Sequence, residues 1–183
     1  MGQTNVPAGL TNVTAVAAGY THSLVLKGNG TVVSWGDNSY GQATVPSGLS
    51  NVVAIVAGWC HSLALINDET VVAWGHNFFH ESSVPDGLSN VVAIAGDASH
   101  SAALKNDGTL GVWGDVASVP AGTEGVVAIA GSGQTTLALI EDGTLLPLWG
   151  ELTAVPLGLS NVVAITGAGD GRNGFFEKVG VWC

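Results

Sequence analysis

Three His-Ser pairs recur along this chain and are the first residues that could carry chemistry: His22-Ser23, His61-Ser62 and His100-Ser101. A histidine can act as the general base for a serine nucleophile, and a neutral imidazole can bind a metal ion. Neighbouring residues of a β-strand point to opposite faces, however, so the two members of each pair diverge. A zinc site also requires three or four convergent ligands with a supporting shell. We therefore predict that the histidines are structural, each fastening a strand end to neighbouring backbone, and that the chain binds no metal.

Two pairs of adjacent carboxylates, Asp68-Glu69 and Glu141-Asp142, are the residues that could suggest a glycosidase. Both pairs fall in predicted hairpin turns, where exposed acidic residues are common. Adjacent turn residues provide neither the separation nor the raised pKa that an acid/base pair needs. The sequence therefore predicts no catalytic residue, no enzyme activity and no cofactor.

The elements that position these residues come from a repeat. A Val-Pro dipeptide opens each of five copies, and the prolines are 39, 39, 35 and 36 residues apart. The copies cover approximately residues 2–40, 41–80, 81–116, 117–152 and 153–183. This period is typical of a small unit stacked several times, so the 183 residues are expected to form a single domain. A tryptophan with apolar flanks ends each copy and indicates packing between units: Trp35, Trp74, Trp113, Trp149 and Trp182.

The second copy shows the predicted strands most clearly, at residues 52–57, 61–66 and 71–75. Asn29-Gly30 and Asp107-Gly108 mark hairpin turns between the last two strands of a copy, whereas Asp68-Glu69 should strain or lengthen that turn. The segment around Val-Pro is expected to be an extended edge strand. Short antiparallel strands repeated radially favour an all-β fold, a β-propeller, with a β-solenoid as the structural rival.

The chain resembles the repeat of the regulator of chromosome condensation family in two phrases: Trp35-Gly36-Asp37-Asn38-Ser39-Tyr40-Gly41-Gln42, and Val53-Ala54-Ile55 followed by His61-Ser62-Leu63-Ala64-Leu65. The likeness covers essentially the whole chain and is greatest to the short-repeat bacterial branch, which includes the propeller-type β-lactamase inhibitor proteins. The resemblance implies a secreted or cell-surface β-propeller, usually of about seven blades. Because this chain carries five Val-Pro…Trp units, we favour a five-bladed ring, with an incomplete propeller completed by oligomerisation as the alternative.

Two activities of similar proteins do not carry over to these residues. The inhibitor proteins place aromatic residues immediately before the histidine of the second phrase, where this chain has Thr21, Cys60 and Ser99. This difference argues against β-lactamase inhibition. Nucleotide exchange on a small GTPase with chromatin docking fits still less, because the blades are too few and a basic tail is missing.

Acidic residues outnumber basic ones by 14 to 4, which gives a net charge of −10. Four cations cannot form the basic stripe that neutralises a phosphate backbone, so we expect no nucleic-acid partner. The apolar runs are far shorter than the roughly 18 residues of a membrane span, so we expect no membrane insertion. No signal-peptide pattern opens the chain, and Cys60 and Cys183 do not indicate a compartment.

The remaining candidate site is a surface formed by loops of the first two copies. Aromatic residues at positions that the repeat does not require are common anchors of protein recognition. We predict a protein-binding patch with an acidic rim, formed by Tyr20, Asp37, Tyr40, Trp59, Phe78, Phe79 and Asp97. The alternatives are that the aromatic residues form a lid over the ring, that the chain is a multivalent carbohydrate-binding lectin, or that it is a structural or assembly module of a bacterial surface protein.

Overall fold

The computed structural model describes residues 2–115, 119–121, 123–133, 135–149 and 161–166. Within them, twelve strands form four three-stranded antiparallel sheets, each a simple meander. The strands are β1 (Val13–Ala18), β2 (His22–Lys27), β3 (Val32–Gly36), β4 (Val52–Ala57), β5 (His61–Ile66), β6 (Val71–Gly75), β7 (Val91–Gly96), β8 (His100–Lys105), β9 (Leu110–Gly114), β10 (Val126–Ser132), β11 (Thr135–Ile140) and β12 (Leu145–Trp149). The all-β class expected from the sequence is confirmed. No helix in the described part of the chain is long and apolar enough to cross a membrane.

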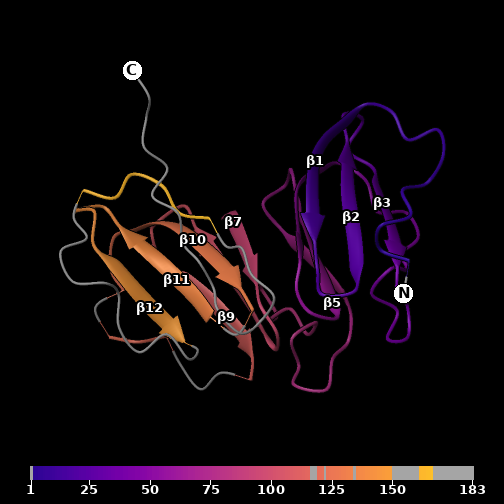
Figure 1. The fold of residues 1–183 in the computed structure, drawn as a ribbon. Helices are drawn as coiled ribbons and strands as arrows, with labels where there is room; N and C mark the ends of the chain where they lie inside the picture. Colours follow the sequence, from indigo (N-terminus) through magenta and orange to yellow (C-terminus); the bar gives the residue numbers. More distant parts are fainter. Residues whose placement is uncertain (1, 116–118, 122, 134, 150–160, 167–183) are drawn as a thin grey trace.

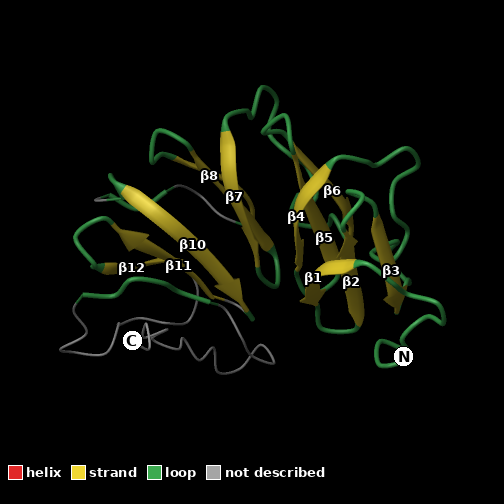
Figure 2. Ribbon diagram, turned by 90° about the horizontal axis from the view of Figure 1, so that it is seen from above, coloured by secondary structure: helices red, strands yellow, loops and turns green. Residues whose placement is uncertain are grey.

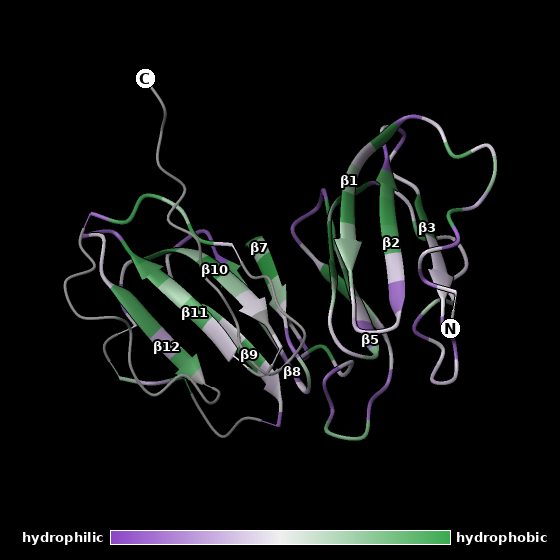
Figure 3. Cartoon of the chain, in the orientation of Figure 1, coloured by the Kyte–Doolittle hydropathy of each residue, from purple (hydrophilic) through white to green (hydrophobic). Residues whose placement is uncertain are grey.

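The four sheets follow one another around an arc (Figure 1, Figure 2). Their first strands contact in series, β1 with β4, β4 with β7 and β7 with β10, so they line the inner side of the arc. Each first strand has a register shift two residues after its start, for example between Val13 and Ala15. The apolar strands and polar connections alternate along the chain (Figure 3). This arrangement is that of successive propeller blades.

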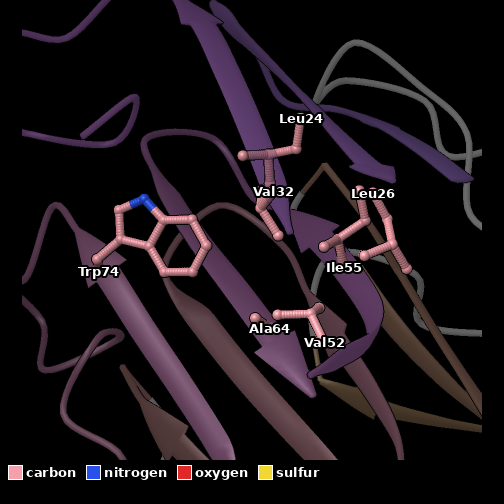
Figure 4. Packing of buried hydrophobic residues seen from close by; sticks show 7 residues of the cluster. All are labelled: Leu24, Leu26, Val32, Val52, Ile55, Ala64 and Trp74. Carbon is pink, nitrogen blue, oxygen red and sulfur yellow. The ribbon is translucent and has the colours of Figure 1, made fainter. Parts of the chain in front are cut away.

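The hydrophobic core lies between neighbouring sheets. Leu24, Leu26 and Val32 of the first sheet pack against residues of the second sheet, which include Val52, Ile55, Ala64 and Trp74 (Figure 4). A second cluster joins the second sheet to the third and contains Trp113. A third joins the third sheet to the fourth and contains Leu104 and Leu148. Each blade is therefore stabilised mainly by its neighbours.

The tryptophans that end the copies differ in burial. Trp74 and Trp113 are buried between sheets, and Trp35 of the first sheet is half-buried. The indole Nε1 of Trp74 donates to the carbonyl of Gln42 at 3.0 Å, just as that of Trp35 donates to the carbonyl of Gln3 at 2.7 Å. The side chains of Trp149 and Trp182 lie outside the described residues.

The segment around Val-Pro is not an edge strand, so that prediction is wrong. The carbonyl of Pro46 accepts a hydrogen bond from the Leu49 N–H at 3.2 Å, and Gly48 has a φ of 82°. These contacts close a turn that reverses the chain after the proline. The side chains of Val45 and Leu49 then pack against the cluster between the first two sheets.

The turn at Asp68-Glu69 keeps the length of its counterparts. Glu69 adopts a φ of 66°, close to the 75° of Gly30, and its N–H donates to the carbonyl of Ile66 at 3.0 Å. A left-handed conformation costs a residue with a Cβ about 1–2 kcal/mol. The turn is therefore strained rather than lengthened.

The fifth copy lies mostly outside the described residues, so the five-bladed ring stays a prediction. Residues 161–166 are described and belong to no strand, and Val162 among them is buried. The four described blades form an incomplete propeller, which agrees with the alternative that the sequence left open.

Candidate functional site

The candidate site lies on the edge of the sheets where β1 and β3 end. Because each sheet is antiparallel, the loop from β1 to β2 and the loop after β3 meet at this edge. The Asp37 N–H donates to the carbonyl of Thr21 at 2.8 Å, and the His76 N–H donates to that of Cys60 at 2.8 Å. The two kinds of loop are thus joined in both the first and the second sheet.

The loop after β3 is held by buried polar contacts. The Gln42 side chain is buried; its Nε2 donates to Asp37 Oδ2 at 2.7 Å and its Oε1 accepts from the Tyr40 N–H at 2.9 Å. The Ser39 hydroxyl donates to Asp37 Oδ1 at 2.8 Å and is the main cause that lowers the pKa of Asp37. The loop is therefore rigid at its base, and Tyr40 projects with 56% of its surface exposed.

The loop after β6 repeats this design with different side chains. Glu81 takes the buried place of Gln42, and its Oε2 accepts from the Phe79 N–H at 2.8 Å. His76 takes the place of Asp37 and bonds Glu81 through Nδ1. In the first loop the buried residue is the donor, Gln42, and its partner is the acid Asp37. In the second loop the buried residue is the acid, Glu81, and its partner is His76, so the same two loop positions are joined in both.

These two loops bring three aromatic residues together around one imidazole. The ring of Tyr40 meets His76 edge-on with centroids 4.6 Å apart. The rings of Phe78 and Phe79 each lie 6.4 Å from His76 and are T-shaped to one another at 5.0 Å. Phe78 is 78% exposed. We call Tyr40, His76, Phe78 and Phe79 the aromatic cluster.

Tyr20 and Trp59 form a second group on the same edge, which we call the aromatic pair. Their ring centroids are 5.2 Å apart although the residues belong to different sheets. The Trp59 N–H donates to the carbonyl of Asp97 at 3.1 Å, which ties this loop to the third sheet. Cys60 follows Trp59; burial, with the charges of Asp37 and Glu81, raises the pKa of its thiol, so it is not an activated thiolate.

The structure gives the first two histidines a partner that sequence reasoning missed. His22 Nε2 bonds Ser62 Oγ at 2.9 Å, and the Ser62 hydroxyl donates to the carbonyl of Gln42 at 3.0 Å. His61 bonds Ser101 in the same way at 3.0 Å. Since each serine donates onward, each imidazole donates through Nε2. For His22 and His61 the expectation of a backbone partner is wrong, because the next blade places its serine hydroxyl there, whereas His100 Nε2 does meet a backbone carbonyl, that of Asp115.

Both imidazoles are completely buried, and burial lowers the pKa of His22 and of His61 to about 4. A buried His-Ser contact between blades cannot meet a substrate. It joins neighbouring blades and performs no chemistry that this structure supports.

Asp97 is not on an exposed rim, because it is 2% exposed between the third and fourth sheets. It stands where the first two copies have Gly19 and Gly58, and a Cβ at either glycine would overlap the imidazole of the same copy. The Asp97 side chain therefore excludes His100 from the position that His22 holds. Its own Oδ2 accepts from the Thr136 hydroxyl at 3.0 Å, as a substitute contact to the next blade.

The displaced His100 lies against Asp97. Its Nδ1 is 2.8 Å from Asp97 Oδ1, and its Nε2 is 2.7 Å from the carbonyl oxygen of Asp115. Burial opposes protonation, but the Asp97 carboxylate and the Asp115 carbonyl together raise the pKa of His100. Both ring nitrogens face acceptors, so the imidazolium form satisfies them best. The sequence feature that could have predicted the displaced His100 is Asp97, which stands where the first two copies have Gly19 and Gly58.

Comparisons with known proteins identify the repeat. The family model described as "Regulator of chromosome condensation (RCC1) repeat" matches residues 13–42 and 52–81. No curated protein matches the chain. The ectodomain of the receptor kinase CR4 from Physcomitrella patens is a similar solved structure, 25% identical with a TM-score of 0.70 over 90% of this chain and 47% of its own.

Two further structures are similar in fold. Yeast RCC1 (Prp20), solved with Kap60 bound, is 22% identical with a TM-score of 0.65 over 80% of this chain and 46% of its own. Human WBSCR16 is 24% identical with a TM-score of 0.62 over 75% of this chain and 47% of its own. This chain spans about half the length of these structures. The predicted β-propeller is thereby confirmed, whereas the bacterial branch and the inhibitor likeness stay predictions. Residues 13–42 and 52–81 therefore match the RCC1 repeat, and the described sheets have the fold of blades in a β-propeller similar to that of RCC1.

Proposed function

We propose that this chain is a non-enzymatic propeller module that binds a protein through the aromatic cluster and the aromatic pair. The observation that carries the proposal is the convergence of Tyr40, Phe78 and Phe79 from two different loops, all exposed, around one histidine. None of the three lies in the hydrophobic clusters between the sheets. Exposed aromatic side chains gathered in one place are typical anchors of protein interfaces.

Rigidity of the loops supports the same function. Buried Gln42 and Glu81 fix the backbone on which the aromatic residues stand. A surface that is ordered before binding loses less conformational entropy when its partner arrives. These contacts favour a preformed docking surface over a loosely packed lid.

The distribution of charge supports a basic partner. Asp37 and the exposed Asp115 lie on the same edge as the aromatic cluster. Lys27 and Lys105 are the last residues of β2 and β8, and those strand ends lie at the opposite edge together with the exposed acidic turn residues Asp68, Asp107 and Asp142, so among the described residues the aromatic edge carries no lysine or arginine. A protein surface with lysine or arginine beside apolar groups would complement this edge in both charge and polarity.

The variation between copies favours one protein surface over a lectin. Blades that bind sugar repeatedly would carry the same stacking residue in each copy. The position of Tyr20 and Trp59 instead holds Ala98 and Gly133 in the next two copies. Among the solved structures of the same fold, yeast Prp20 was crystallised with Kap60, and a second Prp20 study describes binding to Gsp1p and histones. Both findings support a protein as the class of ligand.

Affinity capture followed by mass spectrometry tests the proposal. The wild-type chain is compared with Phe78→Ser/Phe79→Ser and with the control Val53→Ser/Val92→Ser, which changes two exposed valines of the inner strands. We expect a specific partner to be retained by the wild type and the control and lost from the phenylalanine variant. Thermal unfolding verifies that each variant is folded. Equal capture by all three proteins contradicts a role for the aromatic cluster.

A further inference from the structure

The first repeat contains a motif that the other repeats lack. Asn12-Val13-Thr14 and Asn29-Gly30-Thr31 both consist of an asparagine, a residue other than proline, and a threonine, and this pattern with threonine or serine occurs nowhere else in the chain. The asparagine of such a motif is the acceptor for N-linked glycosylation, a modification of surface segments. A three-residue motif also arises by chance, so its meaning depends on the structure around each asparagine.

Asn29 lies in the turn between β2 and β3, and its side chain contacts the threonine of its own motif. Asn29 is exposed, and its Oδ1 accepts hydrogen bonds from the Thr31 N–H at 3.2 Å and from the Thr31 hydroxyl at 2.7 Å. The Gly30 N–H donates to the carbonyl of Lys27 at 2.9 Å and closes the turn. The amide Nδ2 of Asn29, which is the atom that accepts a glycan, makes no hydrogen bond with any described residue. An ordered turn therefore presents the acceptor nitrogen to solvent.

The fold does not require an amide at this position. The same turn has an aspartate in the next three copies, namely Asp68, Asp107 and Asp142. Asp107 Oδ1 accepts from the Thr109 N–H at 2.9 Å and from the Thr109 hydroxyl at 2.6 Å, which are the contacts that Asn29 makes. Since a carboxylate supplies the same acceptor oxygen, the asparagine adds only an amide nitrogen that bonds nothing in the described structure.

Asn12 precedes β1 and is also exposed. Its counterparts Asn51 and Asn90 are exposed as well, so this position is open to solvent also in blades that have a sheet before them. The motif arises here at its third residue, because Thr14 stands where the later copies have valine: Val53, Val92, Val127 and Val163. The Thr14 hydroxyl donates to the carbonyl of Leu26 at 3.3 Å, a long hydrogen bond that explains little of the change from valine.

Both asparagines lie at the edge of the first sheet that is opposite to the aromatic cluster. The Gly28 N–H donates to the carbonyl of Asn12 at 2.8 Å, so the residue before Asn29 is bonded to Asn12. β1 begins and β2 ends at this edge, whereas the aromatic cluster lies where β1 and β3 end. Bulky, hydrophilic sugars at these two positions would cover one edge and leave the aromatic edge free for a protein partner.

We propose that Asn29 and Asn12 are acceptor sites for N-linked glycans. The donor is an oligosaccharide carried on a lipid diphosphate, and a transferase brings it to the chain. Nδ2 of the asparagine attacks the anomeric carbon of the first sugar, so that a carbon–nitrogen bond forms and the bond from this carbon to the diphosphate oxygen breaks. The lipid diphosphate leaves, and Nδ2 gives one proton to a base of the transferase. The chain accordingly passes through a compartment in which such donors are used.

Mass spectrometry of the protein isolated from the cells that produce it tests the occupancy of each site. Peptide N-glycosidase converts a glycosylated asparagine into an aspartate, and water that carries heavy oxygen labels that aspartate. We expect the label at Asn29 and at Asn12. Absence of sugar and of label at either asparagine overturns the assignment of that residue.

Variants of the full chain assign each glycan to its motif when they are secreted from a eukaryotic cell line behind a cleavable signal peptide. Asn29→Asp introduces the side chain of the later copies, so it should fold as the wild type does and lose the mass of one glycan. Thr31→Ser retains the motif and should keep that glycan. Asp107→Asn places the same motif in the corresponding turn of the third repeat and should gain a glycan. An unchanged glycan mass in Asn29→Asp, or no gain in Asp107→Asn, overturns the role of this turn.

Discussion

Acidification should destabilise this protein through two buried histidines well before most carboxylates titrate. His22 and His61 are neutral in the folded chain, where burial lowers each pKa from 6.5 to about 4. The unfolded chain takes up these protons more readily. Folding is therefore favoured fully above pH 6.5, and the advantage is lost as the pH falls toward 4.

The expected loss follows from the two pKa values. Between about pH 8 and pH 5, each histidine should reduce the free energy of unfolding by about 2 kcal/mol, because most unfolded imidazoles are protonated at pH 5 and most folded ones are not. The two together give about 4 kcal/mol, a large part of the stability of a typical domain. His100 acts in the opposite direction, since its raised pKa favours the folded state at low pH and loses that contribution as the pH rises.

Urea unfolding followed by circular dichroism at several pH values measures this effect. The variant His22→Gln/His61→Gln removes both titrating groups, so its stability should change less than that of the wild type by about 4 kcal/mol over the same interval. Val53→Ser, which alters an exposed side chain that does not titrate, should retain the wild-type dependence. The reasoning is refuted if the wild type and the double variant lose stability in parallel.

Three further substitutions test other parts of the structure. Glu69→Gly should raise the free energy of unfolding by about 1 kcal/mol, because glycine relieves the left-handed strain of that turn; chemical denaturation measures it, and a loss of stability would contradict the strain. Gly58→Ala should cost more than about 2 kcal/mol, because its Cβ overlaps a buried imidazole, while Gly28→Ala, whose Cβ meets only ordinary contacts, should be nearly neutral. Asp97→Asn should lower the pKa of His100 by removing the adjacent charge, which an NMR titration of the imidazole would detect; an unchanged titration would show that the carboxylate is not the cause.

Local patterns predicted the elements of this fold well. The strands expected at 52–57, 61–66 and 71–75 agree with β4, β5 and β6, because alternation of apolar residues and turn signals are local properties of the chain. The edge strand at Val-Pro failed for a local reason as well: Gly48 allows a turn directly after the proline. The residue pattern around Val-Pro is compatible with both a turn and an extended segment, so it did not distinguish between them.

Contacts between repeats were harder to predict. The bond between His22 and Ser62 joins residues 40 positions apart, and adjacency in sequence suggested only that His22 and Ser23 diverge. The burial of Asp97 depends on the space that Gly19 and Gly58 leave for imidazoles, which becomes visible only when the blades are stacked. The aromatic residues could be singled out from the sequence, but their gathering around His76 required the loop geometry.

The buried imidazoles also bear on how the number of blades can change in evolution. Each of the first two repeats presents an imidazole to the blade after it, and the second and third present a serine to the blade before. A tandem duplication of the second repeat would therefore create a new junction from parts that already fit. The junction between the third and fourth blades is different, because Asp97 and Thr136 replace the imidazole and serine there. Lengthening by duplication is accordingly easiest among the first three described repeats, where an imidazole meets a serine at each junction.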